Sequence, residues 1–133
     1  MMLSIFMGIF FILHGLVHLL YTGQSGRFFE LRPGMVWPDG SWAFSTLLGN
    51  DMTRLLASIL LVLTALGFLA GGAGLIFHQD WWRPVAMGSA IFSAVIFILF
   101  WDGKFQAWSD KGGVGLLIDL AILIIALLLK QPF

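Results

Sequence analysis

Two histidines, His14 and His18, lie in an apolar run near the start of the sequence, and one aspartate, Asp119, lies in a second apolar run near its end. Histidine changes charge near neutral pH, so it serves as a proton donor and acceptor and as a metal ligand. A carboxylate among apolar residues needs a partner or must become neutral. These three residues are therefore the first candidates for chemistry in this chain.

The spacing of the two histidines places them on one face of a predicted helix, because residues four positions apart lie above one another. Other residues at helical spacing continue this stripe: Met7, Phe11, His14, His18 and Tyr21. A histidine inside a bilayer is costly and usually faces protein or a water-filled cavity. We therefore expect the stripe to face the interior, with the other helices packed against it.

The composition is that of a membrane protein. The chain has 133 residues, of which 59% are hydrophobic and 11% charged, whereas about 25% of a typical soluble domain is charged. The net charge is zero, so nucleic acid is not an expected partner. The absence of cysteine excludes disulfides, iron–sulfur clusters and covalent haem attachment. The first apolar run lacks a basic leader and a small-residue cleavage site, so we expect it to be retained as a helix.

Four apolar runs approach the roughly 20 residues that cross a bilayer, at about 2–22, 52–77, 84–101 and 114–129. Most charged residues and all six tryptophans lie between these runs or at their ends, which is typical of a membrane surface. The sequence predicts a single membrane domain, residues 1–133. The predicted fold is all-α and polytopic, an antiparallel bundle of four transmembrane helices with an interfacial loop between the first two.

The segment between the first two helices, residues 23–50, is long for a connection. It contains the turn signal Trp37-Pro38-Asp39-Gly40, and Ser41 is placed to cap a short interfacial helix over residues 42–48. We interpret the segment as an interfacial connector or, alternatively, as a lid over the histidine end of the bundle. A lid would bring Trp37 and Trp42 near the mouth of the histidine site.

Polar side chains from all four predicted helices fall at similar depth when each helix is counted at about 1.5 Å per residue. They lie toward the membrane surface that carries the 23–50 segment. The predicted ligand-binding residues at this end are His14, His18, Tyr21, Arg54, Ser58, Ser93 and Asp119. Within this group we predict that His14 and Asp119 interact, directly or through one water or ligand atom.

Three uses of this group fit its residue types. A pocket for a lipophilic ligand such as a quinone would use the histidines and the aspartate for hydrogen bonding and proton transfer. A metal site would use His14, His18 and Asp119, because two histidines at i and i+4 with a carboxylate form a known ligand set. A His–Asp or Arg–Asp pair that only fixes helix packing is the structural alternative. Gly15 stands where the zinc-protease motif has glutamate, and two histidines on one helix face cannot clamp a haem.

Small residues recur in the second predicted helix, at Ala57, Thr64, Gly67, Gly71 and Gly74. Small side chains let helix backbones approach closely within lipid. We interpret them as a packing face, because no strand precedes these glycines, as it would in a phosphate-binding loop.

The distribution of lysine and arginine predicts the orientation in the membrane. The histidine end carries five of these residues and the opposite end two: Arg27, Arg32, Arg54, Lys104 and Lys111 against Arg83 and Lys130. We therefore predict that the histidine end is cytoplasmic. Both termini are then on the non-cytoplasmic side.

The run Phe11-Ile12-Leu13-His14-Gly15, the glycine-rich second helix, and Gly113-x-Gly115 followed by Asp119 resemble the DoxX-like family of small four-helix membrane proteins. Some members of that family are the small membrane subunit of a quinone-linked sulfur oxidoreductase, so the resemblance implies a redox accessory role. We expect a protein that binds a quinone-like ligand or serves as such a subunit. The alternative is a non-catalytic structural subunit of a larger membrane complex. The expected partners are membrane lipid and either such a complex or further copies of the chain.

Overall fold

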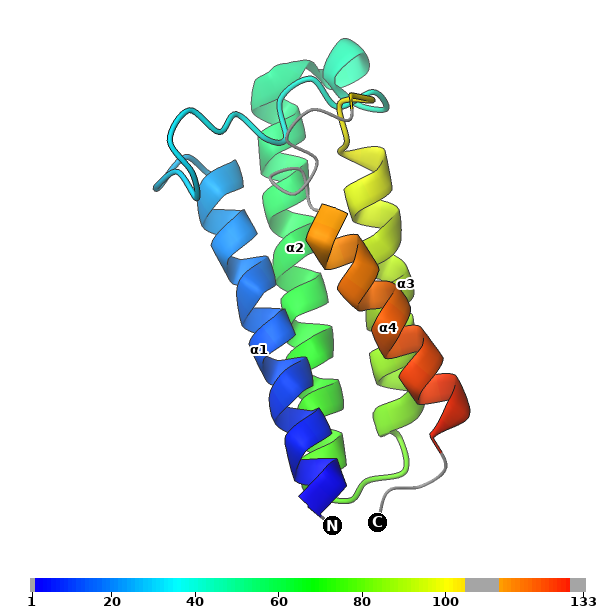
Figure 1. Ribbon diagram of the computed structural model, residues 1–133. Helices are drawn as coiled ribbons and strands as arrows, with labels where there is room; N and C mark the ends of the chain where they lie inside the picture. The colour runs from blue at the N-terminus through cyan, green and yellow to red at the C-terminus, as the bar shows by residue number, and fades with distance from the viewer. Residues whose placement is uncertain (1, 105–112, 130–133) are drawn as a thin grey trace.

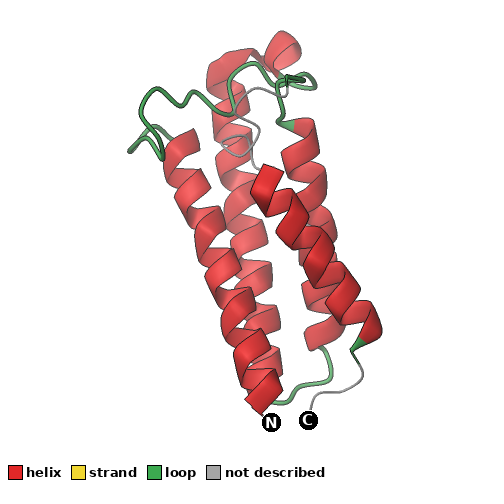
Figure 2. Cartoon of the chain, viewed as in Figure 1, coloured by secondary structure: helices red, strands yellow, loops and turns green. Residues whose placement is uncertain are grey.

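The chain folds into four helices in a computed structural model that describes residues 2–104 and 113–129 (Figures 1 and 2). They are α1 (Met2–Ser25), α2 (Ser45–Ile76), α3 (Trp82–Leu99) and α4 (Gly113–Leu128), and the described residues contain no strand. The all-α prediction is thereby confirmed. Helix α1 packs on α2, α2 on α3 and α3 on α4, and α4 crosses in front of α3 in Figure 1.

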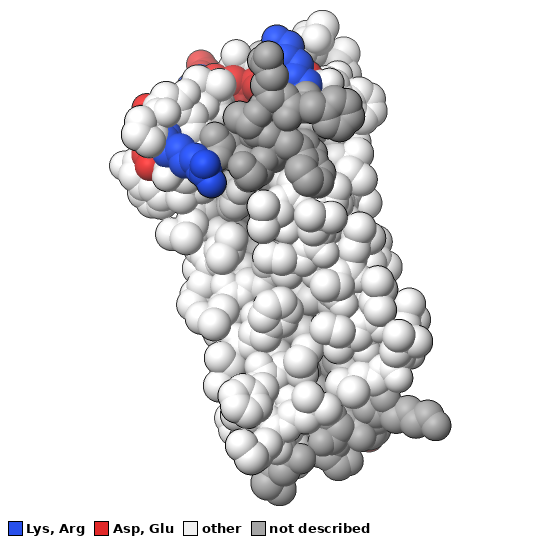
Figure 3. Space-filling view, viewed as in Figure 1, with Lys and Arg blue, Asp and Glu red and all other residues white. Residues whose placement is uncertain are grey.

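Three of the helices, α1, α2 and α3, are long and apolar enough to cross a membrane. Helix α4 is apolar but shorter, with 16 residues. Large apolar side chains are exposed along the outer surfaces of the helices, among them Phe6, Leu66 and Leu127. On the visible face, the charged side chains gather at one end and the middle is uncharged (Figure 3). These features fit a membrane protein.

The helix bounds lie within three residues of the predicted ranges except at the start of α2. This helix begins at Ser45 rather than near residue 52, and it is interrupted at Gly49, where φ is +78°. Glycine adopts this left-handed conformation without the clash that a Cβ atom would cause. The four residues before the break overlap the short helix predicted over 42–48. The Ser41 hydroxyl accepts a hydrogen bond from the Phe44 N–H at 3.3 Å, close to its predicted capping role.

Close contacts between glycines and backbone join α2 to both of its neighbours. A Cβ atom built on Gly72 would lie 2.6 Å from the Gly8 carbonyl oxygen of α1, and one on Gly71 would lie 3.3 Å from Ala86 of α3. No larger side chain fits at Gly72 without separating α1 from α2. The interpretation of the small residues of α2 as a packing face is confirmed at Gly71, which contacts α3, whereas Gly72, which contacts α1, was not among the predicted residues.

The two ends of the molecule are closed differently. We call the end that carries residues 26–44 the loop end, and the end that carries the connection between α2 and α3 the turn end. At the loop end the Trp42 N–H donates to the Trp101 carbonyl at 2.8 Å, which fastens the loop to the end of α3. At the turn end the Arg83 guanidinium of α3 donates to the carbonyls of Ala126 and Leu129 at the end of α4. A cation at this position also complements the negative end of the helix dipole.

Candidate functional site

The two histidines of α1 both face the interior, as their spacing predicts. The exposed fraction is 3% for His14 and 1% for His18. Their rings meet edge to face with centroids 4.7 Å apart. Neighbouring positions of α1 outside the stripe, such as Leu13 and Leu20, are exposed. The local sequence therefore positions both rings, because the helix period turns apolar neighbours such as Leu13 and Leu20 outward and the histidine stripe inward.

Asp119 of α4 is fully buried and pairs directly with His14. The distance between His14 Nε2 and Asp119 Oδ1 is 2.8 Å, across 105 residues of sequence. The predicted interaction between these two residues is thus confirmed in its direct form. A hydrogen bond to an ionised carboxylate is stronger than a neutral one, and the apolar surroundings strengthen it further.

The orientation of His18 is fixed by hydrogen bonds at both ring nitrogens. The ring Nδ1–H donates to the His14 carbonyl at 2.8 Å, because a carbonyl oxygen can only accept. In the neutral ring Nε2 is then the acceptor, and the Ser93 hydroxyl of α3 lies 2.6 Å from it. Ser93 is fully buried and is also within hydrogen-bonding reach of the Asp119 carboxylate. The polar cluster, which we define as His14, His18, Ser93 and Asp119, therefore joins α1, α3 and α4.

Aromatic side chains enclose the polar cluster. The Phe68 ring of α2 packs against both histidines, with centroid distances of 4.8 Å to His14 and 5.2 Å to His18. Phe97 of α3 covers His18 from the loop end at 5.6 Å. The walls exclude water, and charge interactions inside a dry, weakly polarisable site are stronger than at the surface. Helix α2 thus contributes only apolar surface to this site.

Two polar atoms of the cluster have no hydrogen-bond partner in the described part of the chain. They are His14 Nδ1 and Asp119 Oδ2. In the described residues, four buried side-chain atoms lack a hydrogen-bond partner, and these are two of them. An unsatisfied buried polar atom costs about 1–3 kcal/mol. One ligand-type atom from each of His14, His18 and Asp119 lies within 4.8 Å of the others. The cluster therefore holds unused capacity for a proton, a ligand or a metal ion.

The remaining predicted site residues lie outside the polar cluster. Tyr21 is one layer further toward the loop end, where its ring packs on Trp37 and Phe97 with both centroids at 5.3 Å. Arg54 pairs with Asp39 of the loop, with Nε donating to Oδ1 at 2.7 Å. Ser58 donates to the Arg54 carbonyl at 2.9 Å, within its own helix. The side chains of Arg54 and Ser58 therefore bond to Asp39 and to the backbone of α2 rather than to the polar cluster.

Residues 26–44 fold over the loop end as an ordered cover. Trp37 is 4% exposed and lies on Tyr21, Phe97 and Phe100, so it forms the layer above the polar cluster. Trp42 is 58% exposed and donates from Nε1 to the Ile98 carbonyl on the outside of α3. Trp37 thus lies where the lid hypothesis predicts it. Trp42 does not, because it lies at the edge of the cover on the outside of α3.

Three residues that hold this cover in place were not among the predicted site residues: Gln24, Arg27 and Asp39. Gln24 is fully buried and donates to the Met35 carbonyl at 3.0 Å. Arg27 donates to the Trp37 carbonyl at 2.9 Å and pairs with Asp39 at 2.9 Å. The signal in the sequence was that Gln24 follows Tyr21 by three residues and so continues the buried stripe of α1. A glutamine at a helix end is normally expected to face solvent.

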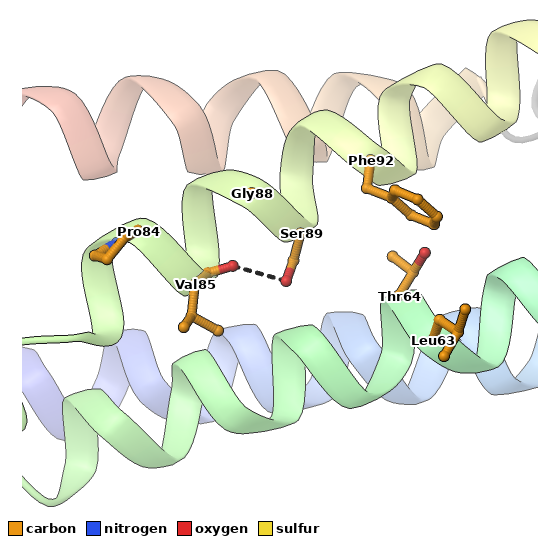
Figure 4. A pocket seen from close by; sticks show the side chains of 7 residues that line it. All are labelled: Leu63, Thr64, Pro84, Val85, Gly88, Ser89 and Phe92. Carbon is orange, nitrogen blue, oxygen red and sulfur yellow. Dashed lines mark hydrogen bonds between the residues drawn. The ribbon is translucent and has the colours of Figure 1, made fainter.

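Two shallow hollows lie on the outer helix surfaces, away from the polar cluster. One, of about 350 Å³, is lined by residues of α2 and α3: Leu63, Thr64, Pro84, Val85, Gly88, Ser89 and Phe92 (Figure 4). Its Ser89 hydroxyl turns back to the Val85 carbonyl of the same helix at 2.7 Å. The other, of about 310 Å³, contains Thr22 and Ser58 and lies between α1 and α2. Both hydroxyls there also bond to their own helix backbone.

The polar cluster combines a proton-accepting pair, a histidine of fixed orientation and a dry enclosure. Such groups can bind and transfer protons, coordinate a metal ion or hold helices together. Comparison of the chain with protein-family models, with curated proteins and with solved structures found no match.

Proposed function

We propose that the chain is an antiparallel four-helix membrane protein in which α4 is the fourth span. The apolar outer surfaces of all four helices and the concentration of charge at the loop end support this arrangement. The 16 residues of α4 extend about 24 Å at 1.5 Å per residue, somewhat less than the roughly 30 Å hydrocarbon core. A shorter span is accommodated by local thinning of the bilayer.

The proposed orientation places the loop end in the cytoplasm and both termini on the other side. Arg27, Arg32, Arg54 and Lys104 lie at the loop end, and Arg83 lies at the turn end. Lys111 and Lys130, which also entered this prediction, lie outside the described residues. A C-terminal reporter that is active only in the cytoplasm should be silent in cells. An active reporter would reverse the orientation.

We propose that the polar cluster carries protons for a lipophilic, quinone-like ligand, and that the protein serves as a redox accessory component of a membrane. The buried bond between His14 Nε2 and Asp119 Oδ1 is the observation that carries this proposal. Reduction of a quinone consumes two protons with two electrons, and a histidine paired with a carboxylate can donate and recover a proton near neutral pH. His18 and Ser93 form a second hydrogen-bonded pair beside the first, between α1 and α3.

The resemblance to the DoxX-like family supports the same proposal. The residues that carry it include His14 and Asp119, which are two members of the polar cluster. In that family some members are membrane subunits of a quinone-linked enzyme. We propose that this chain has a comparable role. The electron-transferring partner is then another protein of the membrane.

Asp119→Asn tests the proposed function, because it keeps the side-chain shape and removes the charge. In detergent, a short-chain ubiquinone analogue should quench the tryptophan fluorescence of the wild type saturably. The variant should bind at least about tenfold more weakly, since a hydrogen bond to a charged group contributes about 1.5–3 kcal/mol. Ser89→Ala is the matched control, because its hydroxyl bonds to the Val85 carbonyl in α3 itself. Equal quenching of wild type and Asp119→Asn would reject the proposal.

A structural subunit of a larger membrane complex is the second candidate. The apolar side chains exposed on the helix surfaces, which include Phe6 at 64% and Leu47 at 81%, favour this role because packed helices would cover them. Purification from native membranes in mild detergent distinguishes the two candidates. A stoichiometric protein partner without bound chromophore or quinone supports the structural role, and a retained quinone supports the binding role.

A further inference from the structure

We infer that His14, His18 and Asp119 bind one divalent transition-metal ion of the zinc type. The inference takes one point from the proposed function, that the reactive centre is the polar cluster. It adds the cofactor that this centre would bind. The donors are one nitrogen from each imidazole and one carboxylate oxygen, all within 4.8 Å of one another and all buried. Imidazole and carboxylate without thiolate suit zinc, iron, nickel or copper ions rather than softer metals.

The donors need only small shifts to surround an ion. Zinc bonds to nitrogen and oxygen are about 2.0–2.2 Å long, so donors in a tetrahedral site lie about 3.4 Å apart. The observed spread of up to 4.8 Å closes with side-chain movements on the order of 1 Å. Three protein ligands also leave a fourth position open, which is typical of reactive rather than structural zinc sites.

His18 already has the orientation of a metal ligand. Metal-binding histidines nearly always donate the second ring N–H to a carboxylate or a backbone carbonyl, which fixes the tautomer. The His18 Nδ1–H donates in this way to the His14 carbonyl at 2.8 Å. The Nε2 lone pair then points into the cluster, where the Ser93 hydroxyl lies 2.6 Å away. A His–Asp pair that only fixes helix packing has no need of a second histidine held in one tautomer.

The unpartnered atoms of the cluster point to the same ligand. Asp119 Oδ2 and His14 Nδ1 have no hydrogen-bond partner among the described residues, although both residues are at least 97% buried. An ion bound to the carboxylate would satisfy the free oxygen. The carboxylate balances one of the two charges of the ion, and an anionic fourth ligand would balance the other. Phe68 and Phe97 exclude bulk water, which favours retention of a bound ion.

Cobalt(II) is a suitable probe, because its visible absorption reports tetrahedral coordination by nitrogen and oxygen. The full chain, purified in detergent and treated with chelator, should bind one equivalent of Co²⁺ with visible bands that an equivalent of Zn²⁺ abolishes. His18→Gln and Asp119→Asn should each weaken Co²⁺ binding at least about 100-fold, because each removes one of three ligands. His78→Gln is the matched control, since His78 lies at the turn end beside Ser4 and its loss should leave the affinity unchanged.

Ser93→Ala separates a metal site from a structural hydrogen-bond network. The Ser93 hydroxyl competes for the His18 Nε2 lone pair, so its removal should make Co²⁺ binding tighter. Weaker Co²⁺ binding by Ser93→Ala than by the wild type would overturn the inference. Absence of stoichiometric Co²⁺ binding by the wild type overturns the inference without reference to any variant. Equal binding by wild type and Asp119→Asn also overturns it.

The same samples distinguish this inference from the proposed function. A wild type that binds Co²⁺ at the cluster but shows no saturable quenching by the quinone analogue keeps the metal site and rejects the quinone function. A wild type that is quenched by the quinone but binds no Co²⁺ keeps the proposed function and rejects the metal site.

Discussion

Two carboxylates of this protein, Asp39 and Asp119, are each paired with basic side chains. They differ in how many of their oxygen atoms have a hydrogen-bond partner. Asp39 in the cover receives Arg54 at both oxygens, at 2.7 and 2.5 Å, and Arg27 at 2.9 Å. Asp119 in the interior receives His14 at Oδ1, and its Oδ2 has no hydrogen-bond partner in the described residues. The carboxylate nearer to water is therefore the better satisfied of the two.

The difference separates a carboxylate whose oxygens are both bonded from one that keeps an unbonded oxygen. Partial burial alone would raise the pKa of the Asp39 carboxyl, but hydrogen bonds from Arg54 and the charges of Arg27 and Arg54 hold that pKa below its ordinary value. Two guanidinium groups fully occupy this carboxylate, so it acts as a clasp for the loop. Asp119 is bonded to His14 at Oδ1, and its Oδ2 keeps no hydrogen-bond partner among the described residues.

The largest effect on stability is expected from His14→Leu, which removes the only nitrogen that contacts Asp119 Oδ1 in the described structure at 2.8 Å. Breaking a buried pair on one side costs about 3–5 kcal/mol, because the remaining charge is left without compensation. The free energy of unfolding, measured by reversible unfolding in mixed micelles, should fall by this amount. A loss below about 1 kcal/mol would show that Asp119 is neutral or finds another partner.

The double variant His14→Leu with Asp119→Leu sharpens the same comparison. Replacing a buried pair by apolar side chains of similar volume is often neutral or stabilising. The double variant should therefore recover most of the free energy lost by His14→Leu, while all Co²⁺ binding is abolished. A double variant as unstable as the single one would indicate that the pair itself is needed for helix packing.

A smaller loss, of about 1–2 kcal/mol, is expected from Asp39→Asn, because the side chain is 17% exposed and water partly compensates its loss. Here the informative measurement is local. Trp37 should become accessible to a water-soluble fluorescence quencher, since Arg27 loses its acidic partner and with it part of its hold on the Trp37 carbonyl. Trp42 is exposed already and should not respond. Unchanged protection of Trp37 would contradict the role of Asp39 as a clasp.

Protonation of Asp39 at low pH should weaken the cover, as the Asp39→Asn substitution does. Asp39 has a lowered pKa in the folded protein, so its contribution is fully present above the unfolded value of 3.8 and is lost as pH falls through the folded pKa. The free energy of unfolding of the wild type should therefore decline below about pH 4 by an amount that Asp39→Asn lacks. If the free energy of unfolding falls equally for wild type and variant between pH 5 and 2, Asp39 is not the cause of the acid sensitivity.

The fold was largely predictable because lipid-sized apolar runs and helical spacing are strong local signals. Those signals placed the helices and turned His14, His18 and Asp119 toward one interior space. The short helix predicted over 42–48 and the longer one predicted from about residue 52 correspond to the two helical pieces of α2, which meet at Gly49. What the signals did not predict is that the two pieces run on directly from one another through a glycine with positive φ.

The composition of the site was predictable only in part. Depth along each helix follows from residue counting, but the rotation of one helix against another depends on packing contacts that a single sequence does not contain. Residue counting therefore grouped Arg54 and Ser58 with the histidines, whereas their side chains bond to Asp39 and to the backbone of α2. Gln24 was not predicted as a buried residue, because a polar side chain at a helix end normally faces water, whereas here it is fully buried.

The smallest effect is expected from Asp51→Asn, which completes the comparison at the solvent-exposed limit. Asp51 is 96% exposed and pairs with Arg54 at 3.3 Å, one turn away on α2. Exposed ion pairs contribute about 0.2–1 kcal/mol and are screened by salt. Arg54 keeps its two bonds to Asp39 in the variant, so the free energy of unfolding should change by less than about 0.5 kcal/mol. The difference should vanish in 1 M salt, where the screening length is about 3 Å. A loss as large as that of Asp39→Asn would mean that Arg54 depends on both carboxylates, and that the clasp extends from the loop onto the first turn after Gly49.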